Sequence, residues 1–277
     1  MKSSTIISIG IPTYNSERWV TKTLNSLLVQ TFSDFEIIIS DNASTDQTYK
    51  ICSDYASQDK RIRIYRNQKN IGAIRNQNKL REYAHSAYFM WSSSSDLYAP
   101  TYIEKCLEGF EKIPGCALSA AKTIFIDEND NIIRAYEEDM SLLDDNPVNR
   151  FNGFFDKVTY NNIFCGIIKK DILDMSVSLG QHIADEYPLM ADLALRGKYL
   201  QTDEYLVYRR QCSNTTFMEM SKVEKIRFLC PYRSSLPKFY RVKYFLHLLK
   251  VIHLSKLTVT GKYRLAKPII YKACKFY

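Results

Sequence analysis

The stretch FEIIISDNASTDQTYKICSDYAS, residues 35–57, decides the fold class of this chain of 277 residues. It opens with a run of strand-forming residues that ends at Asp41, continues through a short polar loop, and then takes up helical spacing. A strand that leads through a polar loop into a helix is the first half of a βαβ unit. The stretch therefore predicts a parallel sheet with helices packed on it.

The same alternation repeats through the first hundred residues. It predicts an α/β, Rossmann-like fold in which helices cover both faces of a mostly parallel sheet. In such sheets ligands bind beside the carboxyl ends of the strands, so the loops after each strand are the places to search for a site. The predicted strands are residues 5–12, 35–41, 61–67 and 88–91, and the predicted helices are residues 16–30, 46–57 and 74–86.

Beyond Pro100 the pattern is less regular, and it mixes helical, extended and loop-like segments. We expect one later helix to end at Gly197, because glycine commonly follows the last helical residue. The predicted segments are a helix over 101–112, a hairpin over 116–136, loop over 137–160, a helix over 185–197 and extended structure over 198–210.

The composition is that of an ordinary globular chain, with 45% hydrophobic and 25% charged residues. The seven cysteines are scattered and include no CxxC pair, which argues against a disulfide framework or a zinc site and favours a reducing, cytoplasmic setting. The N-terminal run reads as a first strand rather than as a signal peptide, and no apolar run of about eighteen residues predicts a membrane span.

The net charge of +8 is unevenly distributed. Residues 221–277 hold 14 Lys and Arg against one acid, a balance of +13, so the first 220 residues carry 8 − 13 = −5. A basic tail on a mildly acidic body predicts an anionic partner, either a membrane surface or a nucleic acid. No motif of a nucleic-acid reader accompanies the charge, so we expect no nucleic-acid partner.

The polar loops at the strand exits follow one another in a specific order, with Asn15 standing 26 residues before Asp41. Taken singly, the first loop could be only a turn and Asp41 only a helix cap. In combination they resemble the family-two inverting glycosyltransferases, which have the GT-A nucleotide-diphospho-sugar fold, over roughly residues 5–212. The matching stretches are IPTYN, DFEIIISDNASTDQT, NIGAIRNQN, YFMWSSSSDLYAP, NIFCGIIKKDIL and ADEYPLMADLALRGKY.

This resemblance implies a site for a nucleotide-sugar donor at the strand exits. The first loop would line the pocket for the nucleotide base, with the Tyr14 ring as a stacking face, and Asp41 would accept hydrogen bonds from the base or ribose. The loop around Gly72 would lie beside the sugar-phosphate, since glycine permits close backbone approach. The donor-binding residues so implied are Pro12, Thr13, Tyr14, Asn15, Asp41, Asn42, Asn70, Gly72 and Asn76.

The loop after the fourth strand departs from the family's pattern. The family carries acidic residues there that hold Mg²⁺ or Mn²⁺ against the two phosphates. Here Asp96 is retained, but Ser93 and Ser95 occupy the carboxylate positions. We therefore expect no metal, or one held weakly through Asp96. Arg209 or Arg210 would then neutralise the departing diphosphate, the alternative being that these arginines form surface salt bridges.

The resemblance also implies a general base, which takes the proton of the acceptor hydroxyl, at the start of the helix before Gly197. Asp185 and Glu186 stand there, and either could serve. The alternative is that this acidic pair only interacts with the helix dipole.

The basic tail contains a segment that predicts an amphipathic helix over 241–257. Val242, Phe245, Leu249 and Ile252 form one stripe, and Lys243, His247 and Lys250 form another. A basic amphipathic helix is typical of an interfacial membrane contact, which suits a lipid-linked acceptor. The alternative is a helix packed on the catalytic domain with solvated lysines.

These observations predict a GT-A domain over 1–215, a basic helical extension over 216–277, and a sugar transferase with a glycan or lipid-linked acceptor. A second hypothesis is a catalytically silent relative that binds a nucleotide-sugar, a glycan or a partner enzyme. A nucleotidyltransferase is a third, but it would need a glycine-rich basic phosphate loop, and IPTYNSE is not one.

Overall fold

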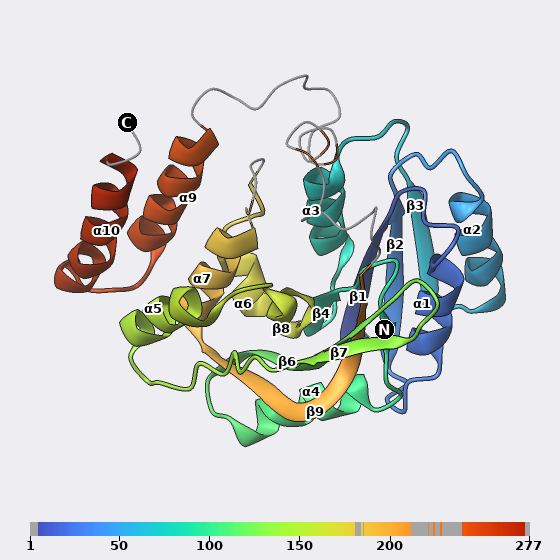
Figure 1. Ribbon diagram of the computed structural model, residues 1–277, viewed down its shortest axis with the longest axis horizontal. Helices are drawn as coiled ribbons and strands as arrows, with labels where there is room; N and C mark the ends of the chain where they lie inside the picture. Colours follow the sequence, from blue (N-terminus) through green and yellow to red (C-terminus); the bar gives the residue numbers. More distant parts are fainter. Residues whose placement is uncertain are drawn as a thin grey trace.

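A computed structural model of the chain describes residues 5–180, 184, 186–211, 221, 224, 228 and 240–274. Figure 1 shows one curled sheet flanked by helices. The strands are β1 Ile7–Thr13, β2 Phe35–Asp41, β3 Ile62–Arg66, β4 Tyr88–Trp91, β5 Leu97–Tyr98, β6 Cys116–Ile126, β7 Ile132–Tyr136, β8 Ile167–Lys169 and β9 Lys198–Arg210. The helices are α1 Val20–Leu28, α2 Thr48–Gln58, α3 Ala73–Tyr83, α4 Tyr102–Lys112, α5 Pro147–Lys157, η1 Asn162–Cys165, α6 Lys170–Met175, α7 Glu186–Arg196, α9 Tyr240–Leu254 and α10 Val259–Cys274.

The sheet has the order β3-β2-β1-β4-β8-β6-β9-β5, with β7 paired to β6. The N-terminal strands β1, β2, β3 and β4 are parallel, as the alternation of strands and helices predicted. β8 runs antiparallel to both β4 and β6, whereas β9 is parallel to β6. The predicted α/β fold is confirmed, and β9 brings the C-terminal part of the sheet back towards the first four strands.

Two apolar cores lie on opposite faces of the sheet. One is formed with α1, α2 and α4 and the other with α3, α5, α6 and α7. In β2 the side chains of Ile37 and Ile39 belong to the first core and Ile38 to the second, because successive strand residues point to opposite faces. This explains why the strand reads as one continuous apolar run.

The prediction of loop over residues 137–160 was wrong, because that segment contains α5. The helix begins where Asn146 caps it, its side chain accepting a hydrogen bond from the Val148 amide at 2.9 Å, and Pro147 occupies the first turn. Phe151 and Phe154 are buried on one face. The proline and the aromatic spacing were present in the sequence, but the surrounding acidic and polar residues masked them.

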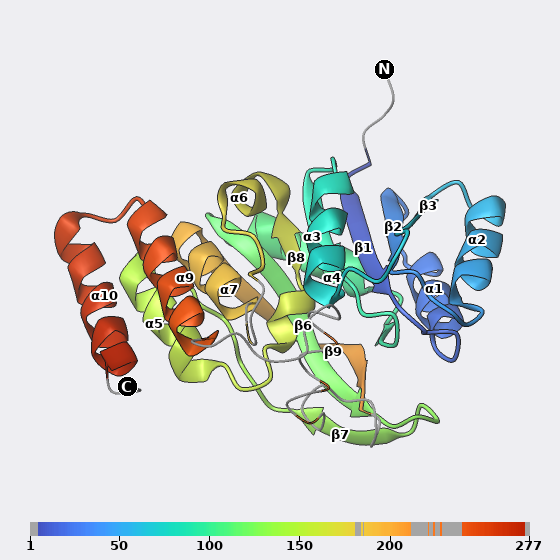
Figure 2. The same cartoon turned by 90° about the horizontal axis from the view of Figure 1, so that it is seen from above.

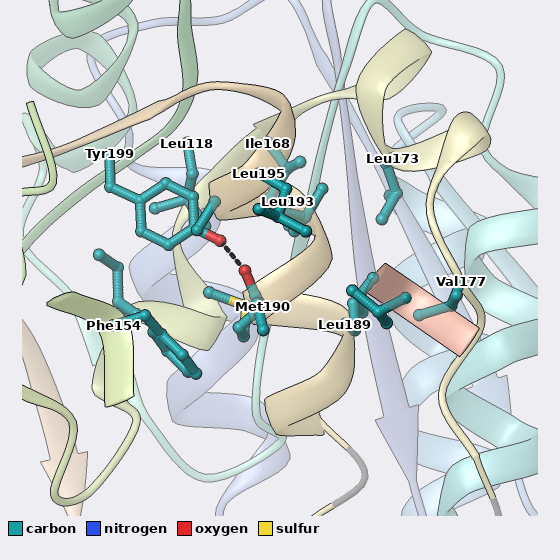
Figure 3. Close-up of a cluster of buried hydrophobic side chains, with 14 of the residues drawn as sticks. Leu118, Phe154, Ile168, Leu173, Val177, Leu189, Met190, Leu193, Leu195 and Tyr199 are labelled. Atoms are coloured by element: carbon teal, nitrogen blue, oxygen red, sulfur yellow. Dashed lines mark hydrogen bonds between the residues drawn. The ribbon is translucent and has the colours of Figure 1, made fainter. Parts of the chain in front are cut away.

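Helix α7 runs through the second core and is held in its middle and at its C-terminal end. Leu189, Met190 and Leu193 are fully buried, and the Tyr199 hydroxyl donates to the Met190 carbonyl (Figure 3). The helix ends at Gly197, as predicted; a Cβ there would lie 2.5 Å from that of Ala117. The body of α7 is therefore held in place by packing.

The extension forms a helical pair, α9 and α10, at the end of the molecule opposite to α2 (Figure 2). Leu248, Val251 and Ile252 of α9 are buried in the same core as α7, and Phe245 and Leu249 pack against it. The apolar stripe predicted for a membrane therefore faces the protein, which favours the packed alternative. The predicted domain boundary at 215/216 lies outside the described residues.

Candidate active site

Three strands end in register at one end of the sheet, and their exit loops touch one another. Thr13, the last residue of β1, pairs with Asp41 of β2, which pairs with Arg66 of β3. The Asn42 amide donates to the Thr13 carbonyl and the Asn67 amide to the Asp41 carbonyl, each at 2.8 Å. The sequence-predicted donor loops therefore lie together.

Asp41 is completely buried at this end of the sheet. Its Oδ1 accepts from the Thr13 hydroxyl at 3.4 Å and its Oδ2 from the Ser44 amide at 3.1 Å. Arg66 places Nε 3.3 Å from Oδ2, and its half-exposed guanidinium lies 4.3 Å from the centroid of the Tyr49 ring. Asp41 thus anchors the loops, and Arg66 adds a cation that the sequence reasoning missed.

The loop after β1 presents Tyr14 to solvent on a fixed backbone. Tyr14 is 43% exposed. Asn15 adopts a left-handed φ of 49°, its side-chain oxygen accepts from the Thr45 amide at 2.9 Å, and its own amide donates to the Ser44 hydroxyl at 3.0 Å. Asn15 therefore joins the loops after β1 and β2. Tyr14 is the residue of the first loop whose aromatic ring is exposed.

A network of side-chain amides joins the β2 exit to α3. Asn42 Oδ1 accepts from Asn67 Nδ2 at 3.1 Å and from the Ile71 amide at 2.9 Å. Asn42 Nδ2 donates to Asn70 Oδ1 at 2.9 Å, and the same Asn70 oxygen accepts from the Gly72 amide. Gly72 has a φ of 88°, which only glycine adopts without strain. The network fixes the shape of the loop before α3.

Asn76 and Pro12 lie behind these loops. Asn76 is buried, its Oδ1 accepts from the Ser40 hydroxyl at 2.7 Å, and its Nδ2 donates to the Ser40 carbonyl at 2.7 Å. Pro12 pairs in register with the same Ser40. Both residues support the donor loops, and their direct contact with a donor stays a prediction.

The four serines after β4 bond mainly to one another and to the first loop. The Ser92 amide continues the ladder to the Gly10 carbonyl at 2.9 Å. The hydroxyls of Ser93 and Ser95 lie 2.9 Å apart. Those of Ser94 and Ser16 are also 2.9 Å apart, which joins the serine loop to the loop after β1. The hydroxyls therefore form a connected polar surface beside the Tyr14 loop.

Asp96 holds the end of this loop against β9. Its Oδ1 accepts from the Arg210 amide at 3.0 Å, its carbonyl accepts from the Thr23 hydroxyl at 2.8 Å, and the residue is 5% exposed. Burial raises the pKa of the Asp96 carboxyl, and the charge of Arg209 opposes that rise. The carboxylate serves as a link between two elements.

These residues do not fit a divalent cation. Mg²⁺ and Mn²⁺ prefer anionic oxygen ligands, but Ser93 and Ser95 present neutral hydroxyls paired with each other, and Asp96 is bonded to backbone. Among the residues that the structure describes, no three His, Cys, Asp or Glu side chains gather in a way that could hold a metal ion. The ligand set that the resemblance implies is therefore incomplete.

Arg210 is committed to the protein, which differs from the predicted role as a cation for the diphosphate. Its Nε donates to the Ser95 carbonyl at 3.1 Å and its Nη1 to the Asp127 carbonyl at 2.6 Å. Its Nη2 pairs with Asp130, and the guanidinium lies 4.2 Å from the Trp19 ring centroid. Because the side chain is 1% exposed, Arg210 fastens the β6–β7 turn to the serine loop.

Arg209, the preceding residue, is partly exposed. Its Nη1 donates to the Tyr160 carbonyl at 3.3 Å and to Asn162 Oδ1. Within the described part of the chain, Nε and Nη2 donate to no protein acceptor. Of the two arginines, Arg209 is therefore the one whose guanidinium keeps N–H groups that could donate to a ligand near the serine loop.

Glu186 is the first residue of α7, as expected for the implied general base, and it is partly exposed. Its charge contributes to raising the pKa of Tyr187, although burial is the larger cause. Asp185, the other candidate, lies outside the described residues. An acid at this helix N-terminus is also favoured by the helix dipole, so geometry alone leaves both interpretations open.

The comparisons with known proteins place this chain in a family. The family model described as "Glycosyl transferase family 2" matches residues 8–174, more than half of the chain. The chain therefore belongs to glycosyl transferase family 2, and it has the GT-A fold.

Named relatives agree with this assignment. An uncharacterised glycosyltransferase of Methanocaldococcus jannaschii is 30% identical over 134 residues, 48% of this chain and 46% of the relative. The chondroitin synthase of Escherichia coli is 31% identical over 133 residues, 48% of this chain and 19% of the synthase. The chain thus spans less than half the length of these two curated relatives.

Among solved structures, S. aureus TarS residues 1–349 in complex with UDP-GlcNAc has a TM-score of 0.67 at 17% identity, covering 95% of this chain and 71% of that one. At this identity the likeness concerns the fold. It nevertheless extends over nearly the whole chain, well beyond the residues that the family model matches.

Proposed function

We propose that this enzyme transfers a sugar from a nucleotide-sugar to a glycan or lipid-linked acceptor, with inversion at the anomeric carbon. The observation that carries the proposal is that the loop of Tyr14 and the serine loop meet at the carboxyl ends of the strands, with the charge of Arg209 acting on Asp96 at the end of the serine loop. An exposed ring and a cation match the base and the diphosphate of such a donor, and the buried Asp41 fixes the loops that carry them. TarS, the structural neighbour, carries UDP-GlcNAc in its own structure.

The reaction would be a single displacement. Asp185 or Glu186 would take the proton of the acceptor hydroxyl as its oxygen attacks the anomeric carbon, and the bond from that carbon to the phosphate oxygen would break. Arg209 would balance the negative charge on the departing nucleoside diphosphate, with the Ser93 and Ser95 hydroxyls donating hydrogen bonds. No step in this proposal uses a metal ion.

Two measurements test the donor and the stereochemistry. A panel of UDP-, GDP- and dTDP-sugars is expected to contain one member that raises the unfolding temperature, because a ligand of the folded state stabilises it by mass action. NMR of the product is expected to show the anomeric configuration opposite to that of the donor. A product with the configuration of the donor would refute inversion, and a panel without any stabilising member would refute the donor class.

Weak or absent metal dependence is part of the proposal. Calorimetric titration with the nucleoside diphosphate of the stabilising sugar is expected to give the same Kd, within about threefold, with Mn²⁺ and with EDTA. A threefold difference in Kd corresponds to about 0.6 kcal/mol of binding free energy, which is the most that we expect a metal ion to contribute. Tight binding that requires Mn²⁺ would contradict the reading of Ser93 and Ser95.

A catalytically silent relative is the second candidate, favoured by the loss of the carboxylates at Ser93 and Ser95. The two candidates differ in donor turnover. An active enzyme hydrolyses its donor slowly even without acceptor, whereas a silent one binds the donor and leaves it intact. Release of free sugar, abolished by substitution of both Asp185 and Glu186, would decide for the enzyme.

A peripheral place on a cytoplasmic membrane surface completes the proposal. It is supported by the charge of the extension and by α10, whose Val259, Tyr263 and Ile270 are exposed on one row together with Lys267. No helix in the described ranges is long and apolar enough to cross a membrane. Such contact would bring the enzyme to a lipid-linked acceptor.

A further inference from the structure

An aromatic surface stands beside Arg209, on the side away from Arg210. The rings of Tyr136 and Tyr160 lie 5.4 Å apart at 89°, and both contact the buried Phe125 ring at 5.3 and 5.7 Å. Tyr160 is 39% exposed, and the Arg134 guanidinium lies over the same rings. Aromatic surfaces of this kind bind the apolar faces of ligands by stacking.

Next to this surface, several buried polar atoms have no hydrogen-bond partner among the residues that the structure describes. Glu138 is 8% exposed; its Oε1 accepts from the amide and hydroxyl of Thr159, each at 3.1 Å, but within the described residues no donor reaches its Oε2. Asn161 is 5% exposed, and neither its Oδ1 nor its Nδ2 has a partner there. Nδ2 of Asn162 is also buried and has no hydrogen-bond partner among the described residues. Buried polar groups left unbonded are costly, so such a cluster requires an explanation.

The backbone is also held in an uncommon conformation at this place. Asn161 has a φ of 49°, in the left-handed region, where asparagine is tolerated but not preferred. Strained residues of this kind concentrate at ligand sites. The uncommon backbone conformation and two of the atoms without a partner therefore belong to one residue, Asn161.

The segment of residues 159–162 lies between the two parts of the candidate active site. Its Tyr160 carbonyl and Asn162 side chain accept from Arg209, the cation proposed for the diphosphate. The Tyr187 hydroxyl, from the residue after Glu186, donates to the Thr159 carbonyl at 3.5 Å. A molecule bound on the segment would thus sit beside both the leaving group and the base.

We propose that residues 159–162, together with Tyr136 and Glu138, form the acceptor subsite, and that it takes a neutral pyranose ring of a carbohydrate. The sugar stacks on the exposed Tyr160 ring and touches the perpendicular Tyr136 ring at one edge, and its hydroxyls donate to Glu138 Oε2 and bond to the Asn161 side-chain amide as the segment adjusts to it. A hydroxyl suits both partners because it donates and accepts.

The charges at the subsite decide between ligand classes. Glu138 disfavours an anionic group at the buried end, and Arg134 and Arg209 disfavour a cationic one near the rings. A neutral polyol face is the chemistry that satisfies the aromatic, amide and carboxylate groups together. The inference rests on the proposed function, since it names the acceptor class of that transferase.

The probes are methyl β-D-glucopyranoside, methyl β-D-galactopyranoside and methyl 2-acetamido-2-deoxy-β-D-glucopyranoside, observed by saturation-transfer NMR on the full chain. At least one is expected to bind the wild type, and Tyr160→Ala is expected to weaken that binding by about tenfold, the scale of a lost aromatic contact. Glu138→Gln, which keeps the side-chain size, is expected to weaken it by a similar factor. Tyr263→Ala, at an exposed tyrosine of α10, is the matched control and should change nothing.

Thermal stabilisation by the nucleotide-sugar panel, measured on the same variants, distinguishes a failure of the subsite from a failure of the proposed function. If a nucleotide-sugar stabilises the protein but no glycoside binds, or if Tyr160→Ala and Glu138→Gln both bind as the wild type does, the subsite is refuted and the proposed function stands. If glycosides bind as expected and no nucleotide-sugar stabilises, the proposed function fails, and the subsite stands as a carbohydrate-binding site without the role of an acceptor site. Far-ultraviolet circular dichroism confirms that each variant is folded, and an unfolded Tyr160→Ala leaves Glu138→Gln as the deciding variant.

Discussion

At the scale of single residues, Asp96 and Arg210 show how groups at a candidate active site can serve to hold it together. Asp96 accepts a backbone amide of β9, and Arg210 spans the serine loop, the β6–β7 turn and Trp19. Both side chains are almost fully buried. Substitution of either is expected to change stability together with activity, whereas Tyr14 and Arg209, which are more exposed, can be changed with less effect on the fold.

Tyr14→Ala is expected to weaken nucleotide binding. A ring that stacks on a base contributes about 1–3 kcal/mol, so the Kd for the nucleoside diphosphate should rise by about five- to one-hundred-fold. Tyr14→Phe keeps the ring and should bind within about threefold of the wild type. Isothermal titration measures both. Equal losses in the two variants would mean that the hydroxyl, and not the ring, makes the contact.

Asp185→Asn and Glu186→Gln distinguish the two candidates for the base. Loss of a general base lowers kcat by about 10²–10⁴-fold, whereas loss of an acid that only favours the helix dipole leaves kcat nearly unchanged and lowers stability by about 0.3–1 kcal/mol. Donor hydrolysis rates and unfolding midpoints of the two variants provide both readouts. Near wild-type rates in both would remove this pair from the mechanism.

At the scale of elements, α7 couples the candidate base to the core. Asp192, fully buried in α7, accepts from the Val177 amide at 2.8 Å and from Arg196 Nε at 2.9 Å. Burial is the largest influence on this carboxyl and raises its pKa above the ordinary 3.8, in spite of the opposing hydrogen bonds and arginines. Helix α7, which begins with Glu186, therefore contains a buried carboxyl group with a raised pKa.

The sign of the resulting pH dependence follows from the raised pKa. Between the ordinary value and the raised one, the folded state binds the proton more tightly than the unfolded state, so stability falls as pH rises through this window. Asp192→Asn cannot titrate. Urea unfolding from about pH 4 to about pH 7 should therefore show the wild type losing stability relative to the variant as pH rises. A difference in stability between the wild type and Asp192→Asn that stays constant with pH would contradict the raised pKa of Asp192.

The sequence predicted elements well where a single local signal decided them. The apolar runs of β1, β2 and β4 and the stop at Gly197 needed no information from distant residues. The exit loops could be placed together because parallel strands share one end. The pairing of Asp41 with Arg66 follows from strand register, but only once β3 is known to be the neighbour of β2.

Other features depend on partners far along the chain and could not be read from the sequence. The amphipathic stripe of α9 suits a membrane and a protein core equally, and only its packing on α7 separates them. In a sequence Glu138 and Asn161 are ordinary polar residues; they become unusual only because burial leaves Glu138 Oε2 and the Asn161 amide without a partner among the described residues. That the protein itself holds the Arg210 side chain could be seen only from its contacts with Asp127 and Trp19.

At the scale of the whole molecule, charge and shape divide along the long axis. The basic α9–α10 pair lies at one end and the mildly acidic sheet domain extends to the other (Figure 1). This separation predicts electrostatic contact with an anionic surface through the end that carries α10.

Vesicle binding tests this prediction. The protein is expected to bind phosphatidylserine vesicles in preference to phosphatidylcholine vesicles and to dissociate as salt rises. Arg264→Glu with Lys267→Glu on α10 should weaken binding by about tenfold or more, since each basic residue contributes about 1 kcal/mol. Lys60→Glu with Lys69→Glu, the same charge change on exposed residues of the opposite end, is the control. Equal effects of the two pairs would refute a contact specific to α10.

The thirteen residues of β9 carry one more consequence. Neighbouring side chains of a strand point in opposite directions, so Arg209 reaches Tyr160 and Asn162 while Arg210 reaches Trp19 and the turn after β6. Inserting one residue within this strand would bring Tyr208 to the place of Arg209, and deleting one would bring Gln211 to the place of Arg210, so either change would remove one of the two arginine contacts. We therefore expect homologues to tolerate changes of composition along this strand far more readily than changes of its length.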